Sequence, residues 1–466
     1  MMESGKSIKS DREDQGCTEN RMDSFRKDIG RRDFLRVTAA AGAGLMLSSM
    51  ALGQAGGSKS DDLNVALLGS GVQGQVLLNA CLKIPGIRFK AVCDIWTEYN
   101  QKRAARLLKK YGHELNTYED YREMLDRESD LDAVIIATPD FWHAEQTVAC
   151  LKAGLNVYCE KEMSNTLEGA RKIAQAARET GKLLQIGHQR RSNPRYLHCY
   201  KLLKDTKILG RITAINGQWN RSVQPELGWP KKYAIDQASL EKYGFKSMSQ
   251  YRNWRWYRNL GGGPIVDLGS HQIDIFNWFL DATPRSVMAS GSRSYYDKKT
   301  HEWYDTVMAI YDYETREGIV KAFYQTITTN SSQGYYESFM GDQGTLLISE
   351  AGGRGGVYRE PSAPDWDKWV KIDYLKAPIE PEPATSAGAV LDIRETLAPP
   401  QYDLAVEFKD PYHKPHLENF FDAIRGKTSL SCPQEIGYET AVAVLKVNQA
   451  IEAGSLLDFK PAEFRI

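Results

Sequence analysis

The chain has no excess of charge, no paired-cysteine motif and no apolar run long enough to cross a membrane. Its 466 residues include 60 lysines and arginines against 60 aspartates and glutamates, which argues against a nucleic-acid partner or a charged membrane surface. The seven cysteines form no C-x-x-C pair and no zinc-type spacing. The uncharged run 37–52 falls short of the ~20 residues that a membrane span needs.

The first fifty-five residues have the order of features that marks an export leader. A basic stretch containing Arg31 and Arg32 precedes the apolar run, and small residues at 51, 53 and 55 offer cleavage points. The paired arginines predict a twin-arginine signal peptide over 1–55 and a periplasmic protein with no membrane span after signal removal. Because that route exports folded proteins, a cofactor bound in the cytoplasm would travel with the chain. The alternative is a chance Arg-Arg pair before a short buried helix.

Residues 62–187 alternate short apolar strands with longer amphipathic segments. The expected strands cover 63–68, 87–93, 133–137, 156–159 and 183–186, and the expected helices cover 76–84, 99–111, 144–153 and 167–180. This alternation predicts an α/β domain built on a parallel, doubly wound sheet.

A glycine-rich loop, Gly69-Ser70-Gly71-Val72-Gln73-Gly74, directly follows the first expected strand. In the G-x-G-x-x-G pattern the first glycine permits a tight turn, the second lets the backbone approach a pyrophosphate, and the third permits close helix packing. A purely structural glycine turn is the alternative. Asp94 ends the second strand, where its carboxylate can accept hydrogen bonds from ribose hydroxyls and would repel a 2′-phosphate. We therefore expect NAD rather than NADP.

Residues 188–466 follow a different pattern, which predicts an α+β domain with a mainly antiparallel sheet. Alternating strands are expected at 212–219, 287–291, 306–313, 319–327 and 345–349, and C-terminal helices at 416–425 and 435–453. The aromatic-rich stretch 221–257 has little periodicity and is expected to be an insertion bordering a site. Residues 361–400 are expected to be an irregular surface excursion.

Three further motifs occur in a fixed order: ATPDFWH at 137–143, EK at 160–161 and GGGPIVDLGSHQID at 261–274. Together with the glycine loop they resemble the Gfo/Idh/MocA oxidoreductase family, from about residue 62 to the C-terminal helix. The family has Glu-Lys-Pro where this chain has Glu160-Lys161-Glu162, so the proline that would stiffen the turn after the lysine is absent. The resemblance implies a small-molecule sugar or glycoside substrate, no metal, and a homodimer or homotetramer. The cofactor-binding residues it implies, in addition to the glycine loop and Asp94, are Thr138, Pro139, His143, Glu160 and Lys161.

Chemistry at this site needs a group that moves the hydroxyl proton when a carbinol is oxidised. Lys161 follows a strand that should end near the nicotinamide, where an amine can act as base or donor. Asp267, His271 and Asp274 lie three and four residues apart, on one face of a helix. We interpret His271 as the general acid/base and Asp267 as a ligand for substrate hydroxyls or for the imidazole. A structural role is as plausible for Asp274, and a satisfied core histidine is the alternative for His271.

Substrate contacts are expected from the segment after the last strand of the first domain and from the tryptophans. His188, Arg190 and Arg191 occupy the position where the family admits substrate, although an interdomain ion pair is an equal alternative for the arginines. Trp219, Trp229, Trp254 and Trp256 are candidates for stacking on a sugar, with Trp254 and Trp256 preferred. His413 and His416 flank Pro415 near the end of the irregular excursion, from which they could reach the site, but they carry no assigned role.

These features predict an exported NAD-dependent oxidoreductase that acts on a sugar or glycoside hydroxyl, with C3 as a candidate, and recycles a tightly bound NAD. An NAD-dependent glycosidase working by transient oxidation and elimination is an alternative. A non-catalytic sugar-binding protein is a third hypothesis, which the combination of Asp94, Lys161, Asp267 and His271 disfavours.

Overall fold

A computed structural model describes residues 62–351, 353–379 and 399–466 of the chain. The predicted signal peptide over 1–55 lies outside the described residues. Within the described ranges, no helix combines the length and apolar character that crossing a membrane requires. The six cysteines in these ranges are all buried and form no disulfide.

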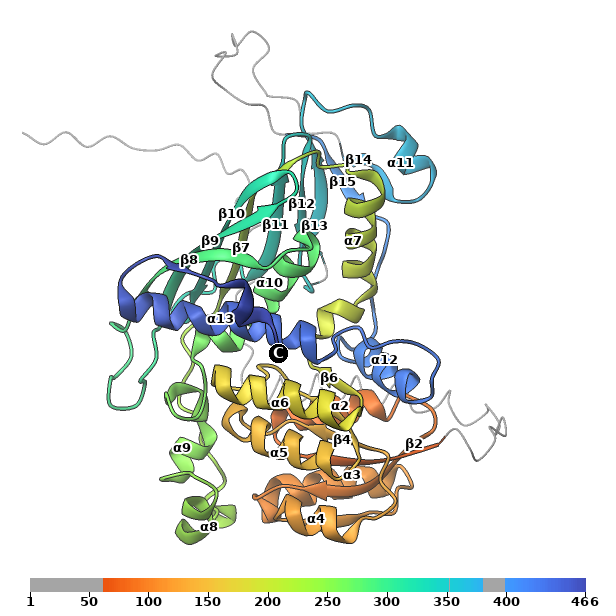
Figure 1. The fold of residues 1–466 in the computed structure, drawn as a ribbon. Helices are drawn as coiled ribbons and strands as arrows, with labels where there is room; N and C mark the ends of the chain where they lie inside the picture. The colour runs from red at the N-terminus through yellow and green to blue at the C-terminus, as the bar shows by residue number, and fades with distance from the viewer. Residues whose placement is uncertain (1–61, 352, 380–398) are drawn as a thin grey trace, which may run out of the picture. The chain divides into compact units, whose positions relative to one another are not determined.

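The first domain contains a six-stranded parallel sheet in the order β3-β2-β1-β4-β5-β6 (Figure 1). Its strands are β1 (Leu63–Leu68), β2 (Ile87–Cys93), β3 (Asn116–Tyr118), β4 (Ala133–Ile136), β5 (Asn156–Cys159) and β6 (Leu184–Ile186). The strand order reverses direction between β1 and β4. Ligands of such open sheets bind outside the carboxyl ends of the strands at this point. The predicted parallel, doubly wound α/β fold is confirmed.

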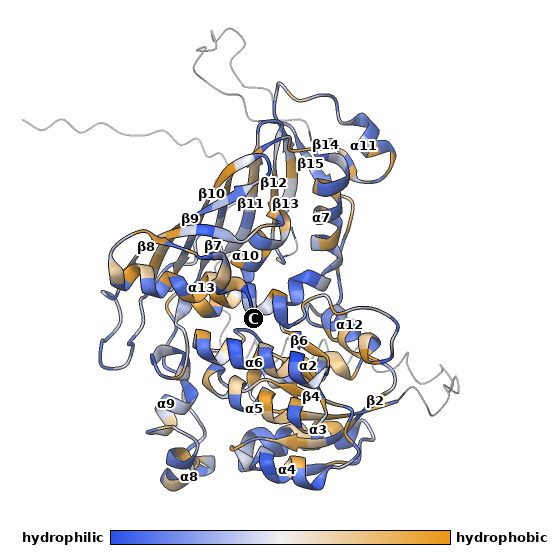
Figure 2. Cartoon of the chain, viewed as in Figure 1, coloured by the Kyte–Doolittle hydropathy of each residue, from blue (hydrophilic) through white to orange (hydrophobic). Residues whose placement is uncertain are grey.

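Helices cover both faces of this sheet because its central strands are apolar on both sides, as Figure 2 shows for β4. The helices are α2 (Val72–Cys81), α3 (Lys102–Lys110), α4 (Tyr121–Arg127), α5 (Asp140–Lys152) and α6 (Leu167–Thr180), with a π-helical turn η1 (Thr97–Gln101) before α3. Val65 and Leu67 pack against α2, whereas Ala66 and Leu68 belong to the core that contains α5 and α6.

Two helices of this domain begin earlier than the sequence predicts, and both begin at the carboxyl edge of the sheet. Helix α2 starts at Val72, directly inside the glycine loop, and α5 starts at Asp140, directly after Pro139. The apolar periodicity starts later because the first turns of both helices carry polar residues. As a result, two helix N-termini point toward the region where a phosphate would be stabilised.

The second domain contains a ten-stranded sheet in the order β14-β15-β13-β12-β11-β7-β10-β9-β8-β16. Its strands are β7 (Ile212–Asn220), β8 (Pro284–Ser292), β9 (Thr306–Thr315), β10 (Gly318–Ile327), β11 (Tyr335–Gly341), β12 (Gly344–Ile348), β13 (Gly355–Arg359), β14 (Leu375–Ile379), β15 (Gln401–Leu404) and β16 (Leu457–Asp458). Only β7 and β10 pair in parallel; the other described pairs are antiparallel. The predicted α+β class is confirmed.

Helix α10 (Pro264–Leu280), which carries Asp267 and His271, packs against β7 and β10 and against α13 (Gln434–Ala453). Helix α12 (Lys414–Ile424) instead packs on α2 of the first domain. The C-terminal part of the chain therefore braces both domains, as Figure 1 shows for α12 and α13.

The part of the stretch 361–400 that the structure describes before residue 380 is more regular than predicted. It contains α11 (Asp367–Lys371) and β14, and the side chains of Trp366 and Leu375 are buried in the core. The expectation of irregular structure was wrong for this part because two widely spaced apolar residues suffice to anchor a short strand pair. Helix α7 (Pro194–Thr206) and strand β11 were also not predicted.

The aromatic-rich stretch 221–257 forms short helical pieces: η3 (Lys231–Tyr233), α8 (Gln237–Lys242), α9 (Met248–Arg252) and η4 (Trp254–Trp256). These pieces share an apolar cluster with the first domain. Trp96 of the first domain and Phe245 of the insertion are both buried in this cluster. The predicted insertion therefore packs against the nucleotide-binding domain, and Figure 1 shows α8 and α9 beside the helices of that domain.

Candidate active site at the carboxyl edge of the parallel sheet

A cavity of about 700 Å³ lies between the carboxyl ends of β1, β2, β4 and β5 and the second domain. Most of the residues predicted to bind the cofactor or substrate line it. From the cofactor set these are Gly69, Gly71, Val72, Gln73, Asp94, Thr138, Pro139, Glu160 and Lys161. From the catalytic and substrate sets they are Trp254, Trp256, Asp267 and His271, and Trp219 lines the cavity as well.

The glycine loop has the form that a dinucleotide requires. Gly69 has φ +83°, and a Cβ there would lie 2.7 Å from the carbonyl carbon of Ala137. A Cβ on Gly74 would lie 2.0 Å from the carbonyl oxygen of Gly69, so the helix packs against the loop with no room for a side chain. Gly71 is different, because its nearest neighbour would be 3.9 Å away and it borders the cavity. A bound pyrophosphate would therefore be held by the Gly71–Gln73 backbone at the start of α2.

Asp94 is held rigidly at the end of β2. Its carboxylate accepts hydrogen bonds from the Ser70 backbone nitrogen at 2.7 Å, from Ser70 Oγ at 3.0 Å and from the Trp96 backbone nitrogen at 2.7 Å. Burial raises the pKa of this carboxyl, and the hydrogen bonds from Trp96 and Ser70 oppose the rise. The carboxylate that would meet ribose hydroxyls thus also fixes the glycine loop.

Glu160, Gln73 and His413 meet beside the glycine loop. Gln73 Nε2 lies 3.1 Å from Glu160 Oε1, to which it donates, and 3.0 Å from His413 Nε2. All three residues border the cavity. His413 precedes α12, so the C-terminal region contributes a side chain to the cofactor site. His416, three residues later, is fully buried and bonds the Ile186 carbonyl oxygen at 2.9 Å, which is a structural role.

His143 and Gly74 do not border the cavity. The two ring nitrogens of His143 lie 2.8 Å from the carbonyl oxygens of Glu162 and Thr138, and the ring is buried. His143 therefore ties the Thr-Pro turn after β4 to the lysine loop after β5. It supports the loops that form the cofactor pocket without bordering the cavity itself.

Lys161, Asp267 and Arg255 form a charged triad on the cavity wall. Lys161 Nζ donates to Asp267 Oδ1 at 3.1 Å and to the Asp267 backbone oxygen, and Arg255 Nε lies 3.3 Å from the same carboxylate oxygen. Burial alone would raise the pKa of Asp267, but the charges of Lys161 and Arg255 outweigh it and hold the pKa below its ordinary value. Asp267 is therefore an anion that orients two cations. In the described structure it makes no hydrogen bond to His271, so the alternative that Asp267 tunes the imidazole is not supported.

His271 lies one turn after Asp267 on α10. It is 8% exposed, its ring packs 5.3 Å from that of Trp219, and its Nδ1 is buried with no hydrogen-bond partner. Burial and the neighbouring charge of Lys161 hold the pKa of His271 well below its ordinary value. The ring is therefore a neutral imidazole at pH 7.

Arg255 and Asp140 are functional candidates that the sequence reasoning missed. Arg255 stands between the two tryptophans that were singled out, so its position in the aromatic stretch was the available indication. Asp140 lines the cavity, and burial raises its pKa to about 6 although His143 and Arg255 oppose the rise. Its place in the ATPDFWH motif was visible, but nothing in the sequence placed it near Arg255.

The structure corrects the expectation that His188, Arg190 and Arg191 bind substrate. None of them lines the cavity, and all three are buried. Arg190 forms ion pairs with Glu337 and, at 2.9 Å, with Glu350. The backbone after β6 does reach the site, through Gln189, but the charged side chains turn inward toward carboxylates that only the tertiary fold supplies.

Arg191 pairs at 2.9 Å with Asp274, which also accepts a hydrogen bond from Thr440. Asp274 therefore takes the structural role that the sequence left open. Trp229 does not border the cavity but packs against the apolar cluster of the insertion. Among the described residues, no group of three His, Cys, Asp or Glu side chains is arranged to hold a metal ion.

Comparison with protein families gives two matches that together span more than half of the chain. Residues 63–188 match the oxidoreductase family with the NAD-binding Rossmann fold, and residues 199–347 match the GFO/IDH/MocA C-terminal domain. The chain belongs to the Gfo/Idh/MocA oxidoreductase family. The predicted NAD-binding domain is confirmed.

Curated relatives of this chain include an inositol dehydrogenase and an anhydrofructose reductase. The chain is 26% identical over 302 residues to the inositol 2-dehydrogenase of Rubrobacter xylanophilus, covering 63% of this chain and 73% of the relative. It is 28% identical over 226 residues to the 1,5-anhydro-D-fructose reductase of Ensifer adhaerens, covering 48% of this chain and 59% of that enzyme. The first alignment thus spans about three quarters of the relative's length and the second about three fifths.

Solved structures share the fold at lower identity. An oxidoreductase domain protein from Kribbella flavida has a TM-score of 0.64 at 17% identity, over 86% of this chain and 99% of that one. A levoglucosan dehydrogenase in complex with NADH and levoglucosan has a TM-score of 0.64 at 18% identity, over 85% and 99% of the two chains. At this level of identity the similarities show a shared fold over most of the chain.

Proposed function

We propose that the protein is an exported NAD-dependent dehydrogenase that oxidises one hydroxyl of a sugar or glycoside, with C3 as a candidate, and keeps its NAD bound between turnovers. The observation that carries this proposal is the meeting of Lys161, Asp267 and His271 in a cavity that the glycine loop also borders. That arrangement combines a cofactor cradle with a cation and a neutral imidazole on one wall.

NAD, when bound, supplies an acceptor for the hydride of the carbinol carbon. The residues of the chain must then remove the hydroxyl proton and stabilise the oxygen as it gains negative charge. His271 is the candidate to take the proton, because its imidazole lines the cavity and its Nδ1 has no hydrogen-bond partner in the protein. Lys161, fixed by Asp267 at 3.1 Å, is suited to hold the substrate oxygen. These assignments give two neighbouring residues two distinct tasks.

Packing of the insertion supports retention of NAD. Trp96, which follows Asp94 at the end of β2, donates from its indole nitrogen to the Tyr233 carbonyl oxygen. Asn100 donates to the Tyr251 hydroxyl at 3.3 Å, and the insertion's Tyr243 and Phe245 border the cavity on the same side. An adenosine bound beside Asp94 would thus have the insertion across its exit. Opening that exit would separate a buried aromatic cluster, which slows release.

Export and assembly extend the proposal beyond the described residues. The paired arginines at 31 and 32, ahead of an uncharged run, support twin-arginine export to the periplasm, where a retained cofactor would be needed because free NAD is scarce.

We also propose that the protein forms a homodimer or homotetramer. In its support, Met288, Ile310 and Phe323 lie side by side on β8, β9 and β10, and Met288 and Ile310 are exposed apolar residues on the face away from α10.

The first experiment is to purify the mature protein without added nucleotide, denature it, and assay the supernatant for NAD and NADH. Near-stoichiometric nucleotide is expected. The holoenzyme is then mixed with hexoses, inositols and methyl glycosides while the absorbance of bound NADH is followed. Reduction of the bound NAD by at least one sugar supports the proposal. A protein that carries no nucleotide and gives no sugar-dependent NADH signal contradicts it. Release of an aglycone without accumulation of NADH would identify the glycosidase alternative instead.

A further inference from the structure

A second chamber of about 90 Å³ adjoins the active-site cavity and has no part in the chemistry proposed above. Its shared wall consists of Arg221, Gln224, Arg255, Trp256 and Asp267, which border both spaces. Its own wall includes Tyr296, His301, Trp303 and Thr328. We refer to this space as the side chamber.

The side chamber lies directly beside the residues proposed to take part in the reaction. The carboxylate of Asp267 receives Lys161 on the cavity side and Arg255, 3.3 Å away, and both Asp267 and Arg255 face the side chamber as well. A substituent that extends from a sugar ring held at Lys161 into the side chamber would therefore run past the carboxylate of Asp267 and the guanidinium of Arg255. Both groups are suited to bind hydroxyls along that path.

The walls of the side chamber are aromatic. The rings of Trp256 and His301 stack with centroids 3.7 Å apart, and those of His301 and Tyr296 with centroids 4.3 Å apart. All three rings are half-buried rather than sealed in the core. Flat rings next to a few polar groups are the surroundings that favour a sugar ring, which has apolar CH faces and hydroxyls at its rim.

One polar atom in this wall lacks a partner. His301 Nδ1 lies 3.0 Å from Thr300 Oγ1, whereas its Nε2 is buried and has no hydrogen-bond partner. Buried polar atoms are rarely left unpaired, so a ligand hydroxyl or a water is expected there. The volume corresponds to roughly three waters at ~30 Å³ each, so the side chamber takes part of a sugar ring while the rest of that ring lies against the wall shared with the active-site cavity.

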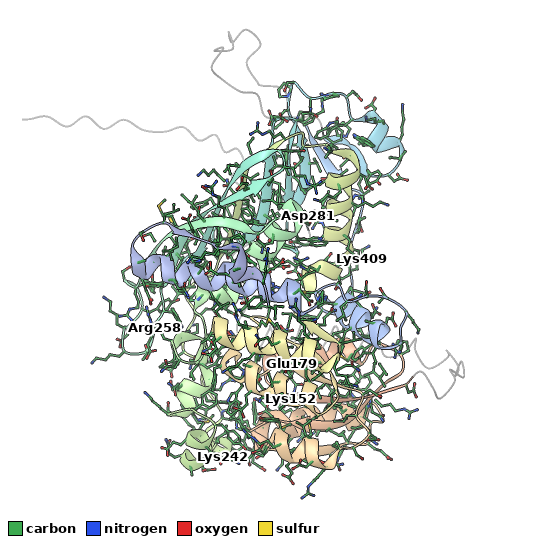
Figure 3. All side chains as sticks on the ribbon, in the orientation of Figure 1. Lys152, Glu179, Lys242, Arg258, Asp281 and Lys409 are labelled. Atoms are coloured by element: carbon green, nitrogen blue, oxygen red, sulfur yellow. The ribbon has the colours of Figure 1, made fainter. Side chains whose placement is uncertain are left out.

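The walls are also braced, so the side chamber is preformed. The Tyr296 hydroxyl donates to the Thr328 carbonyl oxygen at 2.6 Å, and Trp303 Nε1 donates to the Gly261 carbonyl oxygen at 2.9 Å. Arg258, labelled in Figure 3, lies over the Trp303 ring and donates to Glu452 of α13 at 2.6 Å. A preformed subsite loses little conformational entropy when a ligand binds.

We infer that the side chamber is a subsite for a second sugar ring, joined to the ring whose hydroxyl is oxidised. The substrate class is then a disaccharide or larger glycoside rather than a free monosaccharide or inositol. This inference rests on the proposed function for its orientation, since Lys161 marks the reacting end, but the binding that it predicts does not depend on turnover.

The test measures binding and oxidation separately, with each of glucose, galactose and mannose compared with disaccharides that carry the same hexose. The NAD-loaded protein is titrated by calorimetry, and sugar-dependent NADH absorbance is followed in parallel. At least one disaccharide is expected to bind about tenfold more tightly than its matched hexose. His301→Ala and Tyr296→Ala should each reduce that advantage at least fivefold and leave the affinity for the hexose unchanged.

Tyr295→Ala is the matched control, because Tyr295 neighbours Tyr296 but is 59% exposed and lies outside the side chamber. It should keep the full preference for the disaccharide. His301→Phe keeps a stacked ring and removes Nε2, so it tests the hydrogen bond if His301→Ala does not fold. Disaccharides that bind no better than their hexoses, or variants that weaken both equally, would overturn the inference. Loss of NADH formation with intact disaccharide preference would instead contradict only the proposed oxidation.

Discussion

The molecule contains two clusters of charged side chains that differ in their access to the cavity. One faces the cavity. In the other, which we call the sealed cluster, Arg190 and Glu337 lie away from the cavity and only Glu350 borders it. In the open cluster, Asp267 pairs with Lys161 and with Arg255, whose side chain is 50% exposed. In the sealed cluster, Arg190 pairs with Glu337 and Glu350, and its side chain is 1% exposed. Both clusters pair basic with acidic side chains. Access from the cavity, rather than the presence of a buried ion pair, separates a chemical site from a structural one.

The comparison also explains why both clusters are costly to alter, in different ways. Charges that face a cavity can exchange a protein partner for a ligand, so their removal affects chemistry first. In the sealed cluster Arg190 is the cation that balances Glu337 and Glu350, and removing it leaves two carboxylates without a positive charge in a medium of low polarity. Three predictions separate these two situations.

The largest effect is expected at His271. Replacing His271 with Asn removes the group proposed to accept the hydroxyl proton, and should lower the rate of NADH formation by about 10²–10⁴-fold. Stability should change little, because the buried Nδ1 of His271 has no hydrogen-bond partner to lose. Rapid-mixing measurement of NADH absorbance, together with thermal unfolding, checks both parts. A variant of unchanged rate would place the proton acceptor elsewhere on the cavity wall.

Arg190→Met should act on stability instead. It strands Glu337 and Glu350 in the core, and the expected loss in the free energy of unfolding is roughly 3–5 kcal/mol. Denaturant titration of the holoenzyme measures this loss. The control is Lys102→Ala, which removes an exposed helical ion pair and should cost no more than ~0.5 kcal/mol. Equal stability of the two variants would show that the sealed pair is dispensable.

A third effect, smaller within any single pH unit than that of Arg190→Met, is expected at Glu162, which follows Lys161 but is buried away from the cavity. Burial raises its pKa from 4.5 to about 8, although a hydrogen bond from the Met163 backbone opposes the rise. The folded protein therefore holds this proton more tightly than the unfolded chain. The contribution to stability is fully present below about pH 4.5 and is lost as the pH rises to about 8, at no more than ~1.4 kcal/mol per pH unit.

Glu162→Gln should remove this pH dependence. The melting temperature of the variant, relative to that of the wild type, should therefore rise as the pH increases from 5 to 8. Melting curves across that range, with Glu168→Gln as an exposed control on α6, provide the measurement. A constant difference between the two proteins at every pH would show that Glu162 is already ionised in the folded state. Together the three variants show what is lost when a cavity-lining group, a buried ion pair or a single buried carboxyl is altered.

Much of the fold could be predicted from the sequence because local patterns encode it. The strand β1, the glycine loop and Asp94 follow one another within about thirty residues, and their order alone predicts a dinucleotide site. The spacing of Asp267 and His271 likewise places both on one face of α10. What was missed, such as β11 and the strand pair that contains β14, depends on a few apolar residues whose partners lie far along the chain.

The candidate site divides in the same way. The sequence by itself determined the chemistry available: a cofactor loop, a lysine after β5, and an acid and an imidazole one helical turn apart. The tertiary structure decided which charges meet, because Arg190 could turn toward substrate or toward Glu337 with the same local sequence. It also brought His413 to Gln73, Arg255 to Asp267, and His301 to Trp256. Such pairings are set by packing between distant segments, and no local pattern records them.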